Sequence, residues 1–181
     1  MPYPAQTDAQ RIRNAALELL TAHGEGGVTV RGVAKRLGLT PNALYRYYRD
    51  HDALLAELAS VGAARLLGQL REAVGERRGR EAVYAVADAY VVFAAENGAL
   101  YKLLMREHAL TPEQQGVFGA LWAFVKGQVA AVSPNPEAVA VSLWALLHGM
   151  VGLEQARVFR GDKPKVGVRP GVRALLAGFV S

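Results

Sequence analysis

The chain has 181 residues, 51% of them hydrophobic, so it can form a sizeable core and disorder is not expected. Its formal net charge of +5 favours a polyanionic partner. The absence of cysteine excludes disulfide bonds, zinc–thiolate sites and a cysteine nucleophile.

The sequence predicts one helix after another, with no convincing strand alternation. Capping residues and N-terminal prolines indicate the helix starts: Thr7 with Gln10, Thr29, Thr40 before Pro41, Asp50, and Thr111-Pro112 with Gln114. Glycines and proline-containing loops indicate the ends: Gly24 to Gly27, Gly38, Gly75 to Arg80, Asn97-Gly98, and Ser133 to Pro136. The later helices are expected at about 81–96, 99–107, 112–132 and 137–159, followed by a polar linker (162–168) and a last helix from Pro170 to Val180. We therefore expect an all-α protein of about nine helices, with three small helices first.

The longest nearly uncharged apolar stretch runs from Ala138 to Leu153 and contains His148. It falls short of the ~18 residues usual for a transmembrane helix, so a helix buried on most sides explains it better. The N-terminus shows no apolar targeting segment. We expect a cytoplasmic protein with no membrane-spanning part.

The window from Val30 to Arg49 meets the requirements of a helix-turn-helix together. The apolar residues that face inward are Val33, Leu37, Leu44 and Tyr47. Ala34 is the small residue where the helices cross, and Gly38 and Leu39 form the turn. Gly38 stands where the chain must turn, a position that favours positive φ.

Positive charge is concentrated on the same unit. Residues 28–49 hold five basic residues and no acidic residue, whereas the first sixty residues hold seven basic and six acidic residues. A solvated basic face on a three-helix bundle is the simpler explanation of such a run. The coincident turn pattern favours a surface that docks on duplex DNA.

These residues resemble the DNA-binding domain of TetR-family transcriptional regulators over about residues 8–58. The motifs that carry the resemblance are Val33-Ala34, Gly38-Leu39-Thr40, Leu44-Tyr45-Arg46-Tyr47-Tyr48 and Asp52-Ala53-Leu54-Leu55. Two positions depart from the family pattern. Tyr48 replaces the usual phenylalanine, and His51 replaces a lysine that tends to meet a phosphate. A histidine is mostly neutral at pH 7, which puts that phosphate contact in doubt.

The resemblance implies a helix-turn-helix DNA-binding domain at 1–52 and a helical effector-binding and dimerisation domain at 53–181. It also implies a homodimer formed by the last two long helices, and a small molecule whose binding changes the separation of the DNA-binding units. The segment from Trp144 to Gly149 is similar to the Trp-x-x-x-His-Gly motif of one TetR C-terminal subgroup. The implied function is a regulator, expected to be a repressor on a palindromic operator that a small apolar or aromatic ligand releases.

We expect the recognition helix at Thr40 to Tyr47. Its exposed start and outer face are assigned to base edges: Pro41, Asn42, Ala43 and Arg46. Phosphates are assigned to Thr40 and Tyr47 first, then to Thr29, Arg31 and Tyr45, with His51 at the family's lysine position.

The effector pocket is expected between residues 81 and 159. Its possible lining is Tyr90, Phe93, Tyr101, Met105, Phe118, Trp122, Trp144 and His148. A solid aromatic core without a cavity predicts many of the same residues. His148 is either a core histidine bonded to a neighbour or a polar group that lines the pocket.

No enzyme is expected, because the sequence lacks a phosphate-binding glycine loop, a nucleophile elbow and paired carboxylates with an identifiable role. The four scattered histidines lack metal-ligand spacing, so neither a metal nor a cofactor is expected. Two alternatives to specific DNA binding remain. A membrane-surface protein would use the same basic patch but leave the glycine turn unexplained, and a helical adaptor would share the dimer helix without a specific DNA site.

Overall fold

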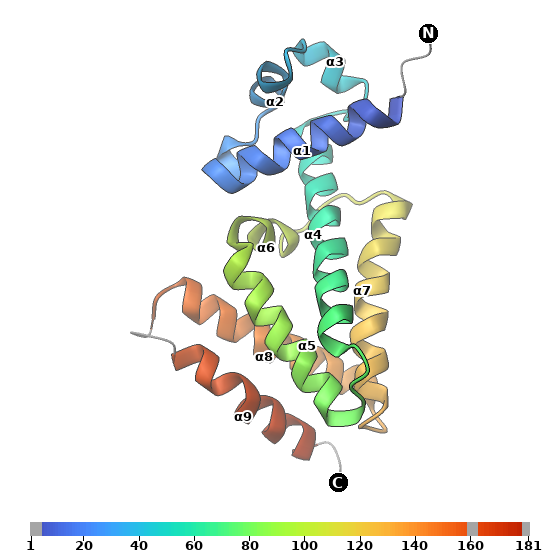
Figure 1. Cartoon of the computed structure of the whole chain (residues 1–181), viewed down its shortest axis with the longest axis vertical. Coiled ribbons are helices and arrows are strands. Elements are labelled where there is room, and N and C mark those ends of the chain that lie inside the picture. The colour runs from blue at the N-terminus through green and yellow to red at the C-terminus, as the bar shows by residue number, and fades with distance from the viewer. Residues whose placement is uncertain (1–4, 159–162, 179–181) are drawn as a thin grey trace. The chain divides into compact units, whose positions relative to one another are not determined.

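The structure is a computed structural model that describes residues 5–158 and 163–178. Within these ranges it has nine α-helices, one 3-10 helix and no strand, which confirms the predicted all-α class (Figure 1). The helices are α1 (Ala5–His23), η1 (Glu25–Gly27), α2 (Val30–Leu37), α3 (Pro41–Tyr45), α4 (His51–Val74), α5 (Gly79–Glu96), α6 (Gly98–Leu104), α7 (Pro112–Ala130), α8 (Pro136–Gln155) and α9 (Lys163–Gly178).

The chain divides into two compact units. Unit 1 comprises the residues up to Ala63 together with Asn97–Phe118, and unit 2 comprises Ala64–Glu96 together with the residues from Gly119 onwards. Helices α4 and α7 therefore each contribute one part to each unit. The predicted domain division after residue 52 stays a prediction.

In unit 1, α2 packs against both α1 and α3. The side chains that fill this core are fully buried: Ile12, Ala16, Leu20, Val33, Leu44 and Leu54. Val33, Ala34 and Leu44 face inward as predicted, whereas Leu39, a predicted turn residue, is 39% exposed.

The predicted caps at Thr29, Asp50 and Thr111 are confirmed, whereas Thr40 precedes α3 without a capping bond from its side chain. The Thr29 side chain accepts a hydrogen bond from the Gly32 N–H at 2.9 Å, and Asp50 Oδ1 accepts one from the Ala53 N–H at 2.7 Å. Gly38 ends α2 in the left-handed conformation, with φ 66° and ψ 27°. These local signals fix the chain's path from α2 to α4.

Three predicted helix boundaries in unit 1 differ from the structure. Helix α6 ends at Leu104, before the expected end at about residue 107. Helix α1 begins at Ala5, before the expected cap at Thr7. Helix α3 ends at Tyr45 rather than Tyr47, because the Tyr47 and Tyr48 N–H groups both bond to the Leu44 carbonyl and close a turn. Arg46 is the C-cap of α3 rather than an interior residue.

In unit 2, α5 packs against both α8 and α9, and α8 and α9 lie side by side (Figure 1). Helix α5 is buried well beyond one apolar stripe, with Val83, Val86 and Tyr90 among its covered residues. Helix α9 buries Val168, Val172 and Leu176 at helical spacing. Because the three buried residues lie before and after Pro170, this packing explains why the helix continues through its internal proline.

The predicted linker up to Val168 and the predicted start of the last helix at Pro170 are wrong, because α9 begins at Lys163 and contains Pro170. Packing against α5 and α8 outweighs the hydrogen bond that the proline removes. Helix α8 ends at Gln155, so the expected continuation toward Phe159 is wrong. Phe159 itself, the expected end at Val180 and the first linker residue, Asp162, lie outside the described residues.

The sequence predicted that the helix containing residues 138–153 is buried on most sides, and this prediction is wrong for α8. Its most apolar 18-residue window is only 28% buried, and Val141 and Leu153 are exposed. Helices α4 and α8 are long and apolar enough to cross a membrane, but core helices of soluble proteins pass the same test. Within a single chain, part of the apolar surface of α8 is therefore exposed, and an explanation other than burial in the core is needed for it.

Candidate nucleic-acid interface and effector site

Helix α3 is anchored by one buried residue and leaves most of its surface free. Leu44 is 1% exposed, while Thr40, Pro41, Asn42, Tyr45 and Arg46 are exposed. Ala43 and Tyr47 are half-buried. The predicted base-contacting residues thus lie together on the short helix and the residue that follows it.

The basic residues around α2 and α3 fall into two groups. Arg36 and Arg49 are occupied within the protein: Arg36 Nε donates to Glu18 at 2.8 Å, and Arg49 Nε lies 3.0 Å from Asp50. Of the five basic residues in 28–49, all of which the structure describes, Arg31, Lys35 and Arg46 have no such partner. These three exposed cations are the part of the predicted charge that is free to meet a polyanion.

Thr29 and Arg31 lie at the N-terminal end of α2. The Thr29 oxygen caps the helix by accepting from Gly32, which leaves its hydroxyl hydrogen available as a donor. Arg31 is exposed one residue into the helix. Both side chains therefore present donors of the kind that phosphates accept.

His51, at the start of α4, has an internal partner. Its Nε2 donates to the Val28 carbonyl at 2.6 Å. This hydrogen bond links the start of α4 to the segment just before α2. Nδ1 lies 3.9 Å from Asp52 Oδ1. A neutral imidazole that donates from Nε2 has an unprotonated Nδ1, which accepts and cannot donate. A phosphate contact from His51 therefore requires a proton on Nδ1.

Three of the residues predicted for the effector pocket form an aromatic cluster in unit 2. The Trp144 ring makes edge contacts with Tyr90 at 5.7 Å and with Trp122 at 6.1 Å between centroids. A cavity of about 10 Å³ lies beside the cluster, and Tyr90 and Trp144 line it together with Leu70, Val86, Val125, Leu143 and Leu147. Pockets for drug-sized ligands are roughly 300–1,000 Å³. The aromatic cluster is therefore closed in this structure.

The remaining predicted pocket residues are Phe93, Tyr101, Met105, Phe118 and His148. Tyr101, Met105 and Phe118 belong to unit 1. In unit 2, Phe93 is 1% exposed, whereas His148 is exposed and is not a core histidine. Helical spacing in the sequence did not distinguish these residues from the three that form the aromatic cluster.

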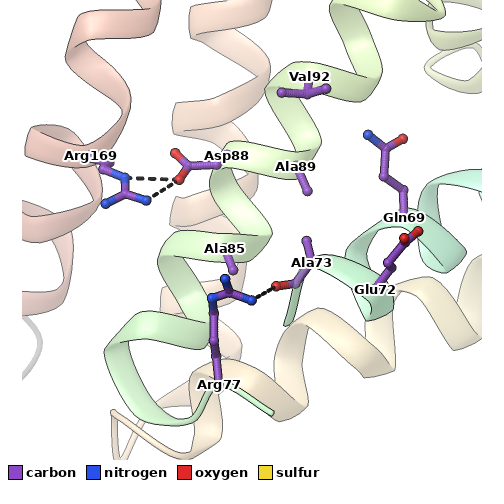
Figure 2. A pocket seen from close by; sticks show the side chains of 9 residues that line it. All are labelled: Gln69, Glu72, Ala73, Arg77, Ala85, Asp88, Ala89, Val92 and Arg169. Atoms are coloured by element: carbon purple, nitrogen blue, oxygen red, sulfur yellow. Dashed lines mark hydrogen bonds and ion pairs between the residues drawn. The ribbon is translucent and has the colours of Figure 1, made fainter. Parts of the chain in front are cut away.

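A larger hollow beside α5 has no counterpart in the sequence analysis. It measures about 460 Å³ and is lined by Gln69, Glu72, Ala73, Arg77, Ala85, Asp88, Ala89, Val92 and Arg169 (Figure 2). Asp88 Oδ2 accepts from Arg169 Nε at 3.0 Å and from Nη2 at 2.6 Å, and this bond raises the pKa of Arg169. The ion pair joins residues 81 positions apart, and alanines form much of the lining. No local sequence signal marks such a site.

Within residues 5–158 and 163–178, no group of three or more histidine, cysteine, aspartate or glutamate residues is placed to hold a metal ion.

Two family models match the chain. One, described as bacterial regulatory proteins of the tetR family, matches residues 12–58, and the other, a tetracyclin repressor-like C-terminal domain, matches residues 83–179. The uncharacterized HTH-type transcriptional regulator YobS of Bacillus subtilis is 36% identical over 98 residues, which are 54% of this chain and 51% of YobS. The chain thus spans about half the length of this curated relative.

Solved structures show the same fold. A protein of unknown function from Rhodococcus sp. RHA1 has a TM-score of 0.84 and 23% identity, with 100% of both chains covered. A tetR-family regulatory protein from Rhodococcus RHA1 has a TM-score of 0.69 and 22% identity, covering 94% of this chain and 96% of that one.

Proposed function

Because the chain belongs to the TetR family of bacterial regulatory proteins, we propose that it binds a palindromic operator as a homodimer and represses transcription. A small apolar or aromatic ligand releases it from DNA. The protein acts in the cytoplasm and carries out no catalytic step. The observation that carries this proposal is the exposed surface of α3 beside three unpaired cations, Arg31, Lys35 and Arg46.

On this proposal α3 enters the major groove. Base edges are contacted by Pro41, Asn42, Ala43 and Arg46. Phosphates are contacted by Thr40 and Tyr47, with Thr29, Arg31 and Tyr45 as further donors and His51 only when Nδ1 is protonated. The two α3 helices of a dimer would read the two half-sites of the palindrome.

The proposed dimer pairs α8 and α9 with the same helices of a second copy. Val141, Ala145, Gly149 and Gly152 follow one another along the exposed side of α8. On α9, Val166 is 74% exposed. An uncharged surface of this kind with small residues allows close helix approach, and a two-fold axis lets one face cover its own copy.

The proposed effector site is the aromatic cluster of Tyr90, Trp122 and Trp144, extended by Phe93 and His148. A role in the effector site for Tyr101, Met105 and Phe118 is proposed from the sequence alone. Because the neighbouring cavity is only about 10 Å³, a ligand must open the cluster before it can enter. It releases DNA only if it binds the non-DNA-binding arrangement more tightly than the DNA-binding one.

The DNA-binding proposal is tested by selecting bound duplexes from a random pool, followed by salt titration of a selected and a scrambled duplex. A palindromic consensus and a selected duplex bound about a thousandfold or more tightly than the scrambled one support specific operator binding. Equal binding of both duplexes contradicts it. Equal duplex binding together with binding to anionic vesicles favours the membrane-surface alternative, and binding to neither favours the helical adaptor.

The effector proposal has an internal reporter. The chain's two tryptophans both lie in the aromatic cluster, so ligand entry there must change the intrinsic tryptophan fluorescence. In a screen of apolar ligands, a compound that weakens operator binding and changes this fluorescence supports the site, and Trp122→Ala should abolish its effect. An Ala89→Leu variant, which fills the hollow beside α5, is the matched control and should respond as wild type does.

A further inference from the structure

Helix α7 begins with a reciprocal capping box. The Thr111 N–H donates to Gln114 Oε1 at 3.0 Å, and the Gln114 N–H donates to Thr111 Oγ1 at 3.3 Å. This arrangement uses the amide oxygen of Gln114 and leaves its NH₂ group for another partner. A glutamate at this position would cap the helix equally well but would have no proton to donate.

The NH₂ group of Gln114 binds a residue of α4. Gln114 Nε2 donates to Glu57 Oε2 at 3.1 Å, and Arg13 Nη1 of α1 donates to Glu57 Oε1 at 3.0 Å. The two oxygens of one carboxylate are thus divided between α1 and α7. The Glu57 side chain is 23% exposed and that of Arg13 35%, so this pair is less screened than an ordinary surface pair.

The end of the helix-turn-helix lies close to this carboxylate. Burial raises the pKa of Tyr48 to about 12, and the negative charge of Glu57 acts in the same direction, while Arg13 lowers it. Tyr48 lies in the turn between α3 and α4. Glu57 therefore lies where α1, α4, α7 and the segment after α3 meet.

Two more contacts within unit 1 join the segment around α6 to η1 and to α4. Arg106, just after α6, forms an ion pair with Glu25 of η1. Gly62 of α4 faces Leu100 of α6 so closely that a Cβ added at Gly62 would lie 3.1 Å from Leu100 Cγ. The segment around α6 thus contacts the elements that precede and follow the helix-turn-helix in the chain.

We propose that Glu57 is a positioning residue for operator binding, through which the first turn of α7 holds α1 and the adjoining recognition unit in the DNA-binding arrangement. Gln114 is its partner on α7, and the choice of glutamine over glutamate follows from the need to cap and donate at once. The same helix continues to Trp122 in the aromatic cluster, so α7 connects Glu57 to the proposed effector site through one helix. This inference rests on the proposed operator binding.

The test compares two variants that each add one negative charge to neighbouring residues of α7. Gln114→Glu places a carboxylate against Glu57, whereas Gln115→Glu alters an exposed side chain whose amide donates to the Leu110 carbonyl at 3.2 Å. Operator affinity is measured on the selected duplex, at a temperature where circular dichroism shows every variant folded. We expect Gln114→Glu to bind about tenfold more weakly than Gln115→Glu, because a donor to a charged group is replaced by a like charge.

A swap then separates positioning from a general loss of packing. In Glu57→Gln/Gln114→Glu the amide and the carboxylate exchange places, and the hydrogen bond between α4 and α7 can re-form. Recovery of most of the lost affinity supports the proposal, and no recovery overturns it. If Gln114→Glu does not fold, Gln114→Met replaces it, and a folded Gln114→Met that binds like wild type also overturns it. A wild-type protein that selects no duplex overturns the proposed function itself, and this inference with it.

Discussion

Gly38 directs the chain from α2 to α3 through a left-handed backbone conformation. Its N–H and that of Leu39 bond to carbonyls of the last turn of α2, which closes the helix. No atom lies within 4 Å of a Cβ built at this position. Any cost of a side chain here therefore comes from the backbone conformation rather than from a clash.

Replacing Gly38 should destabilise unit 1 through this backbone strain alone. We expect Gly38→Ala to lower the free energy of unfolding by about 1 kcal/mol and Gly38→Val to lower it further, because a β-branched residue suits positive φ poorly. Urea denaturation measures both. The control is Gly26→Ala, whose Cβ also meets open space but whose φ is not in the left-handed region. Equal losses at both glycines would contradict the turn argument.

Arg46 and Arg36 form a natural comparison, since both are exposed arginines but only Arg36 has a carboxylate partner. Arg46→Ala should weaken operator binding by about 1–3 kcal/mol and relax specificity at one base. Arg36→Ala removes the same charge and should have a smaller effect without any change in base preference. Anisotropy titrations on single-base operator variants measure both properties. An Arg46→Ala protein with unchanged base preference would show that Arg46 does not read a base.

Tyr48 should make stability sensitive to alkaline pH. Its pKa is raised from 10.0 to about 12, so the folded state holds the phenolic proton more tightly than the unfolded state does. The resulting stabilisation is fully present below pH 10 and is lost as the pH rises through 12. Tyr48→Phe should therefore lose less stability than wild type over this range in urea denaturation. Parallel curves for the two proteins would contradict the assignment.

At the scale of the element, α9 shows tertiary packing overriding a local signal. Pro170 is exposed on the helix while Val168, Val172 and Leu176 are buried on its other side. Gly171 lies so close to α8 that an added Cβ would be 3.2 Å from Leu146. The helix is held through its proline by this close packing.

Pro170→Ala should stabilise unit 2 because it restores a backbone donor inside a helix. We expect about 2 kcal/mol, since the gain from a proline-free helix interior is partly offset by a more flexible unfolded chain. Thermal and urea unfolding measure the change. Pro136→Ala serves as the control, because Pro136 stands at the start of α8 where no hydrogen bond is missing. A Pro170→Ala protein no more stable than wild type would indicate that α9 is bent to suit the proline.

The elements that could be predicted from sequence are those with local causes. The caps at Thr29, Asp50 and Thr111 and the turn at Gly38 each involve residues within a few positions of one another. The start of α9 could not be predicted, because its cause is packing against distant helices. The same holds for the candidate sites: the α3 surface follows from one short motif, whereas the Asp88–Arg169 pair and the Glu57 contacts join residues far apart in the chain.

At the scale of the whole molecule, the exposed apolar side of α8 is the surface that the proposed dimer would cover. Ala145 lies at the middle of this side, between Val141 and Gly149. A charge placed there would be buried without a partner in the proposed dimer, at a cost of several kcal/mol.

Ala145→Glu should therefore convert the protein from dimer to monomer at micromolar concentration, as sedimentation velocity can show. Operator affinity should fall with it, because a palindromic site needs two half-site contacts. Ala123→Glu makes the same change on an exposed position of α7 and should leave the dimer intact. A dimeric Ala145→Glu protein would place the interface elsewhere.

The proposed dimer face of α8 and α9 also has a genetic consequence. On this proposal, a chain that carries Arg46→Ala but keeps this face intact still joins wild-type chains, and each mixed dimer then binds one half-site of its operator more weakly. Such an allele should be dominant over the wild type when both are expressed together. Adding Ala145→Glu to the same allele should make it recessive, because the defective chain can no longer occupy a wild-type partner.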